Sequence, residues 1–497
     1  EIGSGLVGSE MCIRDRYSIS FINEREFLLM CYADLKAKRL KYHISQSKLA
    51  VASGYTKAAI SSWERNKVIP SPYDLEKLNA ILTQLIDAIN AGTLNIQKKS
   101  IRPSQFASHA LPKNIKSPEE YKSLLSAYSP LSYNPYRAKL SELYKCAQCP
   151  KSSASPKAIA LFSGCGGMSL GFASAGFNVI GHVEIDESAC QIYHHNFPHS
   201  TLLAHDICSI TDKDLFSWQQ QYGPIDLIIG GPPCQGFSLA GKRDPEDVRN
   251  QLYKYYVHIV SVLRPKIFVM ENVRLLTSMK TSDGELFIDC ILRAFSSTGY
   301  SITRHEINAS DYGVPQTRER LFLVGVRSDL NKKFIFPDSI PSDTQKLTFR
   351  DATFDLPFLE SGESSLDPLH WSISHPTHVI QWLKNVPEGH SAHENIDPAL
   401  RPPSGFNTTY KRIRWDEPCS TISTNFSMIS GCRNVHPSST RSLTIREATR
   451  AQSFPDEFIF TGKWGDIRRA IGNAVPPILA ACIAKALYQQ FFDIKSF

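Results

Sequence analysis

The chain has 497 residues, of which 42% are hydrophobic and 21% charged, a balance typical of a globular protein with two or three domains. No apolar run approaches membrane-spanning length and no signal peptide is visible, so we expect no membrane partner. The twelve cysteines lack a disulfide framework, which favours a cytoplasmic location, and the net charge of +7 permits a polyanionic partner. A lone Cys146-Ala-Gln-Cys149 pair is too weak a signal for zinc, and we expect no metal site.

Residues 1–16 resemble a translated adapter sequence, and we expect them to be a non-native artefact. Residues 24–92 carry helix signals. One helix begins at Ser45 and is stopped by Gly54; the next covers residues 56–65, with Thr56 as its N-cap. Leu49, Ile60 and Trp63 can share one core.

This N-terminal unit resembles the helix-turn-helix domain of the phage-repressor-like (XRE) family. The resemblance implies a second helix in the major groove of operator DNA, bound as a dimer. The residues expected to bind DNA are Thr56, Lys57, Ser61 and Arg65. The alternative is an all-α bundle used only for packing or dimerisation.

Residues 93–156 contain recurrent prolines with Ser and Lys between them, which predicts a connector holding at most one helix, within residues 118–145. We expect no chemistry in this segment.

From Lys157 onward, predicted strands and helices alternate, as in a doubly wound α/β sheet. A strand over residues 158–162 leads into a glycine-rich loop, where backbone can approach a ligand closely. Glu184 ends the next strand and Asp206 follows a third, which suits the ribose of a nucleotide-like cofactor. A nicotinamide cofactor also fits this pattern.

The string Gly-Gly-Pro-Pro-Cys-Gln-Gly-Phe-Ser at 230–238 follows a predicted buried strand over residues 225–229. Its glycines and prolines turn the chain out of the sheet and present the Cys234 thiol at a strand end. The alternative for Cys234 is a buried structural cysteine.

Further signals follow. Glu271 lies in a predicted strand over residues 267–273, and a carboxylate at a strand end is costly unless it is solvated, paired or catalytic. Arg318 and Arg320 occupy alternate positions, so in extended backbone they point the same way. Three C-terminal segments complete the pattern: residues 443–450, 453–456 and 471–477.

Together and in this order, these segments resemble the DNA (cytosine-5) methyltransferase family over residues 157–490. The resemblance implies an S-adenosylmethionine-dependent, Rossmann-like catalytic domain at 157–329, a smaller target-recognition domain at 330–440, and a C-terminal return to the catalytic domain at 441–490. Ala160 and Ala470 depart from the family, which often has an acid and a glutamine there.

The resemblance also implies residue roles. Cys234 matches the nucleophile, Glu271 the acid at the cytosine N3 edge, Arg320 the arginine near O2, and Arg318 its supporting partner. The positions that match S-adenosylmethionine contacts are Phe162, Ser163, Gly164, Gly166, Gly167, Glu184, Ile185, Asp206, Ile207, Pro232, Leu252, Asn473 and Val475. In residues 330–440, the expected DNA contacts are Arg401, Lys411, Arg412, Arg414 and Thr421.

The chemistry requires Glu271 to carry or share a proton, so we expect burial to raise its pKa. The target cytosine lies inside a duplex stack and must be flipped out to reach Cys234.

We therefore expect a double-stranded DNA cytosine-C5 methyltransferase of a prokaryotic restriction-modification system, with a possible cognate endonuclease and an autoregulatory N-terminal unit. The alternatives are an orphan or phage-borne methylase, a transcriptional regulator with a vestigial methylase domain, and an enzyme acting on RNA.

Overall fold

The computed structural model describes residues 35–36, 38–39, 44–53, 55–64, 71–90, 114–233, 251–281 and 284–493. The chain divides into two compact units, residues 1–104 and 105–497, which are described separately. The predictions for residues 1–16, Arg65 and Cys234 fall outside the described residues.

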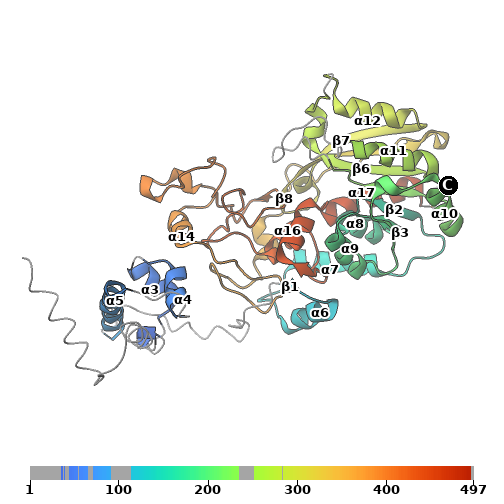
Figure 1. Ribbon diagram of the computed structural model, residues 1–497. Coiled ribbons are helices and arrows are strands. Elements are labelled where there is room, and N and C mark those ends of the chain that lie inside the picture. Colours follow the sequence, from blue (N-terminus) through green and yellow to red (C-terminus); the bar gives the residue numbers. More distant parts are fainter. Residues whose placement is uncertain are drawn as a thin grey trace, which may run out of the picture. The chain divides into compact units, whose positions relative to one another are not determined.

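The N-terminal unit is helical, with α3 (Gln46–Ser53), α4 (Lys57–Glu64) and α5 (Pro72–Asn90) (Figure 1). Thr56 caps α4, its Oγ1 accepting a hydrogen bond from the Ala59 amide at 3.1 Å. Leu49, Ile60 and Trp63 are buried in one cluster together with apolar residues of α5. The predicted helices and their common core are confirmed.

The larger unit is built on a seven-stranded sheet of order β4-β3-β2-β5-β6-β9-β7. The first five strands are parallel, and β9 runs antiparallel to both β6 and β7. The strands are β2 (Lys157–Leu161), β3 (Asn178–Val183), β4 (Thr201–Ala204), β5 (Leu227–Gly230), β6 (Ile267–Val273), β7 (Tyr300–Asn308) and β9 (Glu319–Arg327). The predicted doubly wound sheet is confirmed, with an antiparallel strand near one edge.

Helices cover both faces of this sheet because side chains alternate along each strand. Ala158 and Ala160 of β2 face the first core, whereas Ile159 and Leu161 face the second. Helices that contribute to the first core include α7 (Pro135–Gln148), α8 (Gly167–Ser174), α9 (Glu187–Asn196), α15 (Ile445–Ala451), α16 (Trp464–Asn473) and α17 (Pro477–Phe491). Those of the second core are α10 (Asp212–Tyr222), α11 (Leu252–Leu263) and α12 (Phe287–Ser296).

The segment predicted to be a connector is, over residues 114–150, part of the larger unit. It forms β1 (Asn114–Ile115), α6 (Pro118–Ala127) and α7, and β1 pairs with β11 (Gly462–Lys463). Tyr121, Tyr136 and Leu140 are buried in the first core. The connector prediction is wrong here because its prolines open helices: Pro118 and Pro135 stand in the first turn, where a missing N–H costs nothing.

Residues 330–440 form mostly irregular structure around short elements, as the broken α/β rhythm predicts. They contain α13 (Phe349–Thr353), α14 (Thr377–Leu383) and β10 (Cys419–Ser420), which pairs with β8 (Gln316–Thr317). A separate small core includes Val379, Leu383 and Val435. The described 3-10 helices are η1 (Ile207–Ser209), η4 (Arg274–Ser278), η5 (Ala309–Tyr312), η6 (Ser328–Leu330), η7 (Ala392–Glu394) and η8 (Pro398–Leu400).

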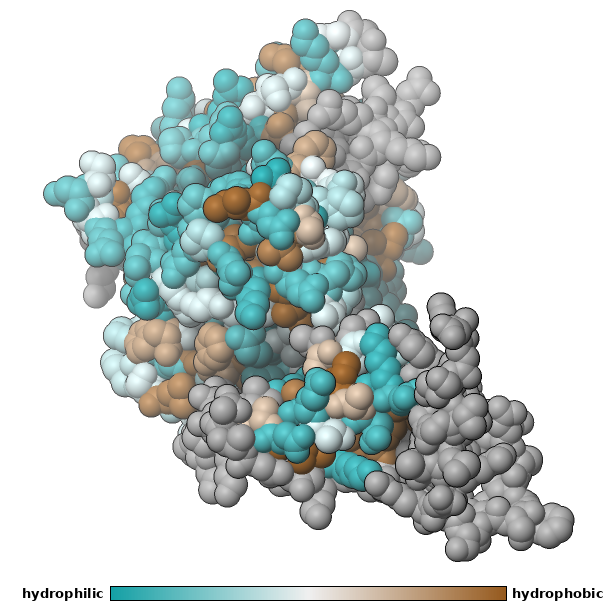
Figure 2. All heavy atoms as spheres, turned by 90° about the vertical axis from the view of Figure 1, so that its left-hand side faces the viewer, coloured by the Kyte–Doolittle hydropathy of each residue, from teal (hydrophilic) through white to brown (hydrophobic). Residues whose placement is uncertain are grey.

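One helical stretch in the described part of the chain, Trp464–Phe491, is long and apolar enough to cross a membrane, contrary to the sequence expectation. It is interrupted between α16 and α17, and 78% of its most apolar window is buried inside the protein. It is therefore a core element. On the face seen in Figure 2, hydrophilic residues predominate and hydrophobic ones form small patches.

Candidate active site

A carboxylate and a guanidinium meet on two neighbouring strands of the sheet. Glu271 lies in β6 and Arg320 in β9, and Arg320 Nε is 2.8 Å from Glu271 Oε1. The antiparallel register brings Val273 opposite Arg320, two residues beyond Glu271. Burial raises the pKa of the Glu271 carboxyl, and the charges of Arg320 and Arg318 oppose this shift without cancelling it. The predicted direction of the Glu271 pKa shift is confirmed.

The turn that follows β5 passes directly beside this pair. A Cβ placed on Gly231 would lie 2.8 Å from Glu271 Oε2, so only glycine fits without displacing the carboxylate. The Pro232 carbonyl accepts a hydrogen bond from Asn272 Nδ2 at 3.0 Å. Cys234 lies two residues beyond Pro232 in the sequence.

The charge of Arg318, the predicted supporting partner of Arg320, acts on both Glu271 and Arg320, but Arg318 makes its hydrogen bonds elsewhere. It is 1% exposed and donates from Nη1 to the Ile422 carbonyl at 3.2 Å and from Nη2 to the Gly472 carbonyl at 3.0 Å. It makes no hydrogen bond to Glu271 or Arg320. Its backbone lies in the one-residue break between β8 and β9.

The glycine-rich loop between β2 and α8 is held by the acid that ends β3. Glu184 Oε2 accepts from the Gly164 amide at 2.7 Å, and Oε1 accepts from the Asp186 amide at 2.9 Å. Gly166 has φ 98°, a left-handed conformation that glycine adopts readily. Burial raises the pKa of Glu184 despite these amide donors. The carboxylate therefore fixes the loop and keeps lone pairs for a further donor.

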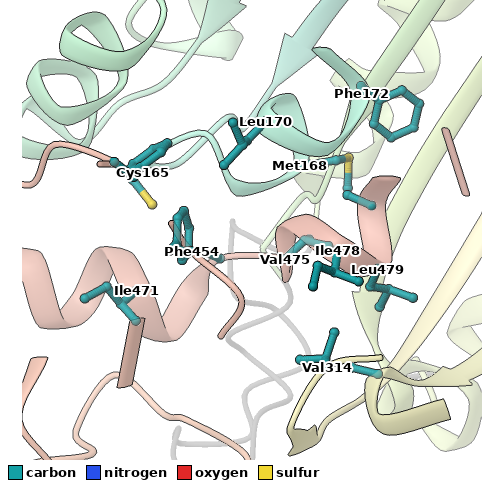
Figure 3. Close-up of a cluster of buried hydrophobic side chains, with 14 of the residues drawn as sticks. Cys165, Met168, Leu170, Phe172, Val314, Phe454, Ile471, Val475, Ile478 and Leu479 are labelled. Atoms are coloured by element: carbon teal, nitrogen blue, oxygen red, sulfur yellow. The ribbon is translucent and has the colours of Figure 1, made fainter. Parts of the chain in front are cut away.

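The same loop packs closely against the C-terminal segment. A Cβ on Gly167 would lie 2.4 Å from the Val475 carbonyl oxygen. Figure 3 shows Met168 near Ile478 and Leu479, and Cys165 near Phe454. This packing brings a segment more than 300 residues away in the sequence to the rim of the loop.

The remaining predicted cofactor residues lie on the loops that follow the parallel strands, at their carboxyl edge, or on segments packed against them. Ile185 is 71% exposed, an unusual state for a large apolar side chain at a site edge. Ser163 Oγ is buried without a hydrogen-bond partner among the described residues. Ile207, Pro232 and Val475 are buried, Phe162 and Leu252 are half-buried, and Asp206 and Asn473 are exposed.

Comparison with known proteins agrees with this geometry. Residues 157–489 match the family "C-5 cytosine-specific DNA methylase", and residues 35–83 match a helix-turn-helix family. The type II methyltransferase M.DdeI of Desulfomicrobium norvegicum is 36% identical over 378 residues, spanning 68% of this chain and 89% of the relative. The chain belongs to the C-5 cytosine-specific DNA methylase family.

Two further relatives are similar over the same part of the chain. The type II methyltransferase M1.HphI of Haemophilus parahaemolyticus is 39% identical, spanning 67% of this chain and 86% of the relative. A DNA modification methyltransferase encoded within an E. coli prophage has a solved structure with a TM-score of 0.54 and 30% identity. The similarity covers 67% of this chain and 99% of the chain in that structure.

Among the predicted DNA contacts of this methylase, Arg412 is buried and cannot contact DNA. It is 2% exposed, and its guanidinium donates to the carbonyls of Leu383, His436 and Ser439 at 2.8, 2.7 and 2.6 Å. The prediction for Arg412 is wrong because neighbouring chain turns surround it with acceptors, which sequence position alone does not reveal.

The other predicted DNA contacts remain accessible to some degree. Arg401 and Arg414 are exposed and Lys411 is half-buried. Thr421 is exposed, and its hydroxyl donates to the Thr317 carbonyl at 2.7 Å. In the N-terminal unit, Thr56 and Lys57 are exposed and Ser61 is half-buried.

Several residues that support the site were missed from the sequence. Asn272 anchors the turn before Cys234, and Gln316 and Gln452 form a buried pair. Asn272 could have been found, because it follows Glu271 directly at the strand end. In the described part of the chain, no group of three or more His, Cys, Asp or Glu residues could hold a metal.

Proposed function

We propose that this methylase transfers a methyl group from S-adenosylmethionine to C5 of a flipped cytosine in a specific duplex DNA sequence. The observation that carries the proposal is the Glu271–Arg320 pair, 2.8 Å apart, lying against the turn that leads to Cys234. An acid, a cation and a thiol are the groups that covalent activation of cytosine requires.

The chain's own residues fit the methyl donor. Glu184, half-buried directly after β3, can accept hydrogen bonds from ribose hydroxyls, and the exposed Ile185 offers an apolar surface to a purine ring. No atom lies within 4 Å of a Cβ built on Gly164, so the loop leaves open space there. S-adenosylmethionine, when bound, supplies an electrophilic methyl group.

The reaction begins at the base. The Cys234 thiolate adds to C6, and the electron pair displaced towards N3 is met by the proton that Glu271 holds. C5 then has enamine character and can take the methyl group. Loss of the C5 proton to a base expels the thiolate, N3 returns its proton to Glu271, and the aromatic ring is restored. In this proposal Arg320, 2.8 Å from Glu271, stabilises charge that develops at O2.

We further propose that this enzyme belongs to a type II restriction-modification system, because the relatives described above are type II methyltransferases. A cognate endonuclease would then act on the same site. The likeness to a prophage-encoded enzyme supports a phage-borne methylase as the second candidate.

The helix-turn-helix unit is proposed to bind a separate operator as a dimer and to regulate expression of the methylase gene. Its recognition helix, α4, presents Lys57 at an exposed position, while Ile60 and Trp63 hold the helix to its own core. A self-contained core is what an independent DNA-binding unit needs.

The test is bisulfite sequencing of host DNA after expression of the wild-type chain and of Cys234→Ser. After expression of the wild type, we expect cytosines at one sequence to resist bisulfite conversion. After expression of the variant, we expect every cytosine to be converted. The wild type should also form a covalent adduct with duplex DNA carrying 5-fluorocytosine, because fluorine cannot leave as a proton. Unchanged methylation by Cys234→Ser would contradict the mechanism.

A further inference from the structure

The backbone of Ile422 is held at both its amide and its carbonyl by residues that directly precede β9. Its amide donates to Gln316 Oε1 at 2.8 Å, and its carbonyl accepts from Arg318 Nη1 at 3.2 Å. The preceding Thr421 hydroxyl donates to the Thr317 carbonyl. The segment 419–424, here called the recognition segment, is therefore aligned in parallel with Gln316–Thr317, only a few residues before Arg320.

The same guanidinium also reaches the C-terminal segment. Arg318 Nη2 donates to the Gly472 carbonyl at 3.0 Å. Gly472 lies directly against the recognition segment, since a Cβ built on it would be 2.3 Å from the Thr424 amide nitrogen. Gln452, bonded to Gln316, donates to the Ile471 and Ala474 carbonyls at 2.9 and 3.0 Å. One buried junction thus joins the recognition segment, residues 316–318 before β9 and residues 471–474 at the end of α16.

This arrangement is costly for the fold. Arg318 is almost completely buried, has no ion pair within 4.0 Å among the described residues, and leaves Nε without a hydrogen-bond partner there. A buried guanidinium held only by carbonyls is a poor source of stability, and an apolar side chain would fill the space at lower cost. Its position between Ile422 and Gly472, two residues from Arg320, suggests a role in function.

We propose that Arg318, together with Gln316, is a positioning residue that couples the seating of the recognition segment on DNA to the alignment of Arg320 with Glu271. A correct DNA sequence fixes residues 419–424. Arg318 and Gln316 then hold β8 and the start of β9 to that segment, so that Arg320 is positioned for the flipped cytosine. An incorrect sequence leaves the recognition segment, and with it Arg320, out of register. The inference rests on the proposed function.

The experiment compares single-turnover methylation of the duplex site found by bisulfite mapping with methylation of duplexes carrying one substituted base pair outside the target cytosine. Arg318→Lys keeps the charge and removes the two-pronged contact with Ile422 and Gly472. We expect its rate on the correct site to fall at least tenfold and the ratio of correct to incorrect rates to fall at least fivefold. Arg327→Lys, the same exchange at the half-buried last residue of β9, should leave both values unchanged.

Gly472→Ala approaches the junction from its other side, because the added Cβ would press on Thr424. Gly472→Ala should also lower the ratio of the methylation rate on the correct site to the rate on incorrect sites. If Arg318→Lys fails to fold, this second variant still tests the proposal. Equal rate losses on correct and incorrect sites in the folded variants would show a structural role only and would overturn the coupling. A wild-type chain that methylates no DNA would instead overturn the proposed function.

Discussion

The Arg320 guanidinium lies 2.8 Å from the Glu271 carboxylate, and the two groups come from antiparallel neighbouring strands. The pair is largely buried, with side-chain exposures of 14% and 12%. In such surroundings a proton on the carboxyl is favoured by burial and opposed by the cation. This balance allows one carboxyl group to share a proton with a base and remain correctly oriented.

Replacement of Glu271 by glutamine should abolish most of the activity without loss of the fold. The amide keeps the shape of the side chain but cannot pass a proton to N3, so methyl transfer should fall by about 10²- to 10⁴-fold. The measurement is single-turnover transfer of labelled methyl groups to the mapped site. Activity within threefold of the wild type would show that N3 is protonated by another group.

The same variant should change how stability depends on pH. Because burial raises the folded-state pKa of Glu271, the native state holds this proton more tightly than the unfolded state. Its contribution to stability is complete below the ordinary glutamate pKa and is lost as the pH rises through the folded-state value. The unfolding free energy of Glu271→Gln relative to the wild type should therefore increase with pH from about 4.5 upward. Urea titrations at several pH values give this difference, and a difference that falls over this range would contradict the shift.

Much of the catalytic unit is predictable from the sequence, because the signals are local. Buried apolar runs become β5 and β6, and Glu271 stands in the strand where the pattern places it. Glycines mark the loop that Glu184 holds. These features depend on neighbouring residues only, so periodicity and turn chemistry are enough to find them.

What the sequence did not reveal depends on partners that are distant in the chain. Arg412 resembles a DNA-binding cation until carbonyls more than 20 residues away are seen to enclose it. The sequence places Arg318 beside Arg320 but does not show its hydrogen-bond partners, which lie about 100 and 150 residues further on. Pro118 and Pro135 are read as linker residues unless the buried faces of their helices are known. No local pattern carries this information.

Removal of the Glu184 carboxylate should weaken binding of S-adenosylmethionine. Glu184→Ala leaves the Gly164 and Asp186 amides without their acceptor and removes the acceptor for ribose hydroxyls. Lost hydrogen bonds of this kind cost about 1–3 kcal/mol, so affinity should fall roughly ten- to hundredfold in calorimetry. The exposed Glu187, the first residue of α9, offers a matched control, whose replacement by alanine should leave affinity unchanged. Tight binding of NADH with none of S-adenosylmethionine would instead favour a dehydrogenase-like site.

The helices α6 and α7 should be essential for the catalytic unit. The Tyr121 hydroxyl donates to the Asp456 carbonyl at 2.8 Å and accepts from Arg446 Nη2 at 3.0 Å, deep in the protein. Tyr121→Phe should lower the unfolding free energy by about 1–3 kcal/mol, because buried polar groups lose their partner. Tyr133→Phe, at a 71% exposed position, should change it by less than about 0.5 kcal/mol. Chemical denaturation measures both values.

A pair of truncations extends this prediction. Residues 105–497 should fold and methylate DNA, whereas residues 151–497 should aggregate, since they lack α6 and α7. A soluble, active 151–497 fragment would show that residues 114–150 are a connector after all.

The N-terminal unit should bind DNA independently of the methylated sequence. It has its own core of α3, α4 and α5 and belongs to a compact unit that ends at residue 104. Deletion of residues 1–104 should therefore leave the bisulfite map unchanged while removing retention of the promoter DNA upstream of the gene. Lys57→Ala should weaken operator binding and lower its salt slope by about one, as expected for a lost phosphate contact. Lys213→Ala removes the same charge from the exposed surface of α10 and should affect neither value. If the truncated enzyme methylates a different sequence, the prediction is wrong. The helix-turn-helix would then take part in target recognition, because operator binding and the choice of methylation site would depend on the same unit.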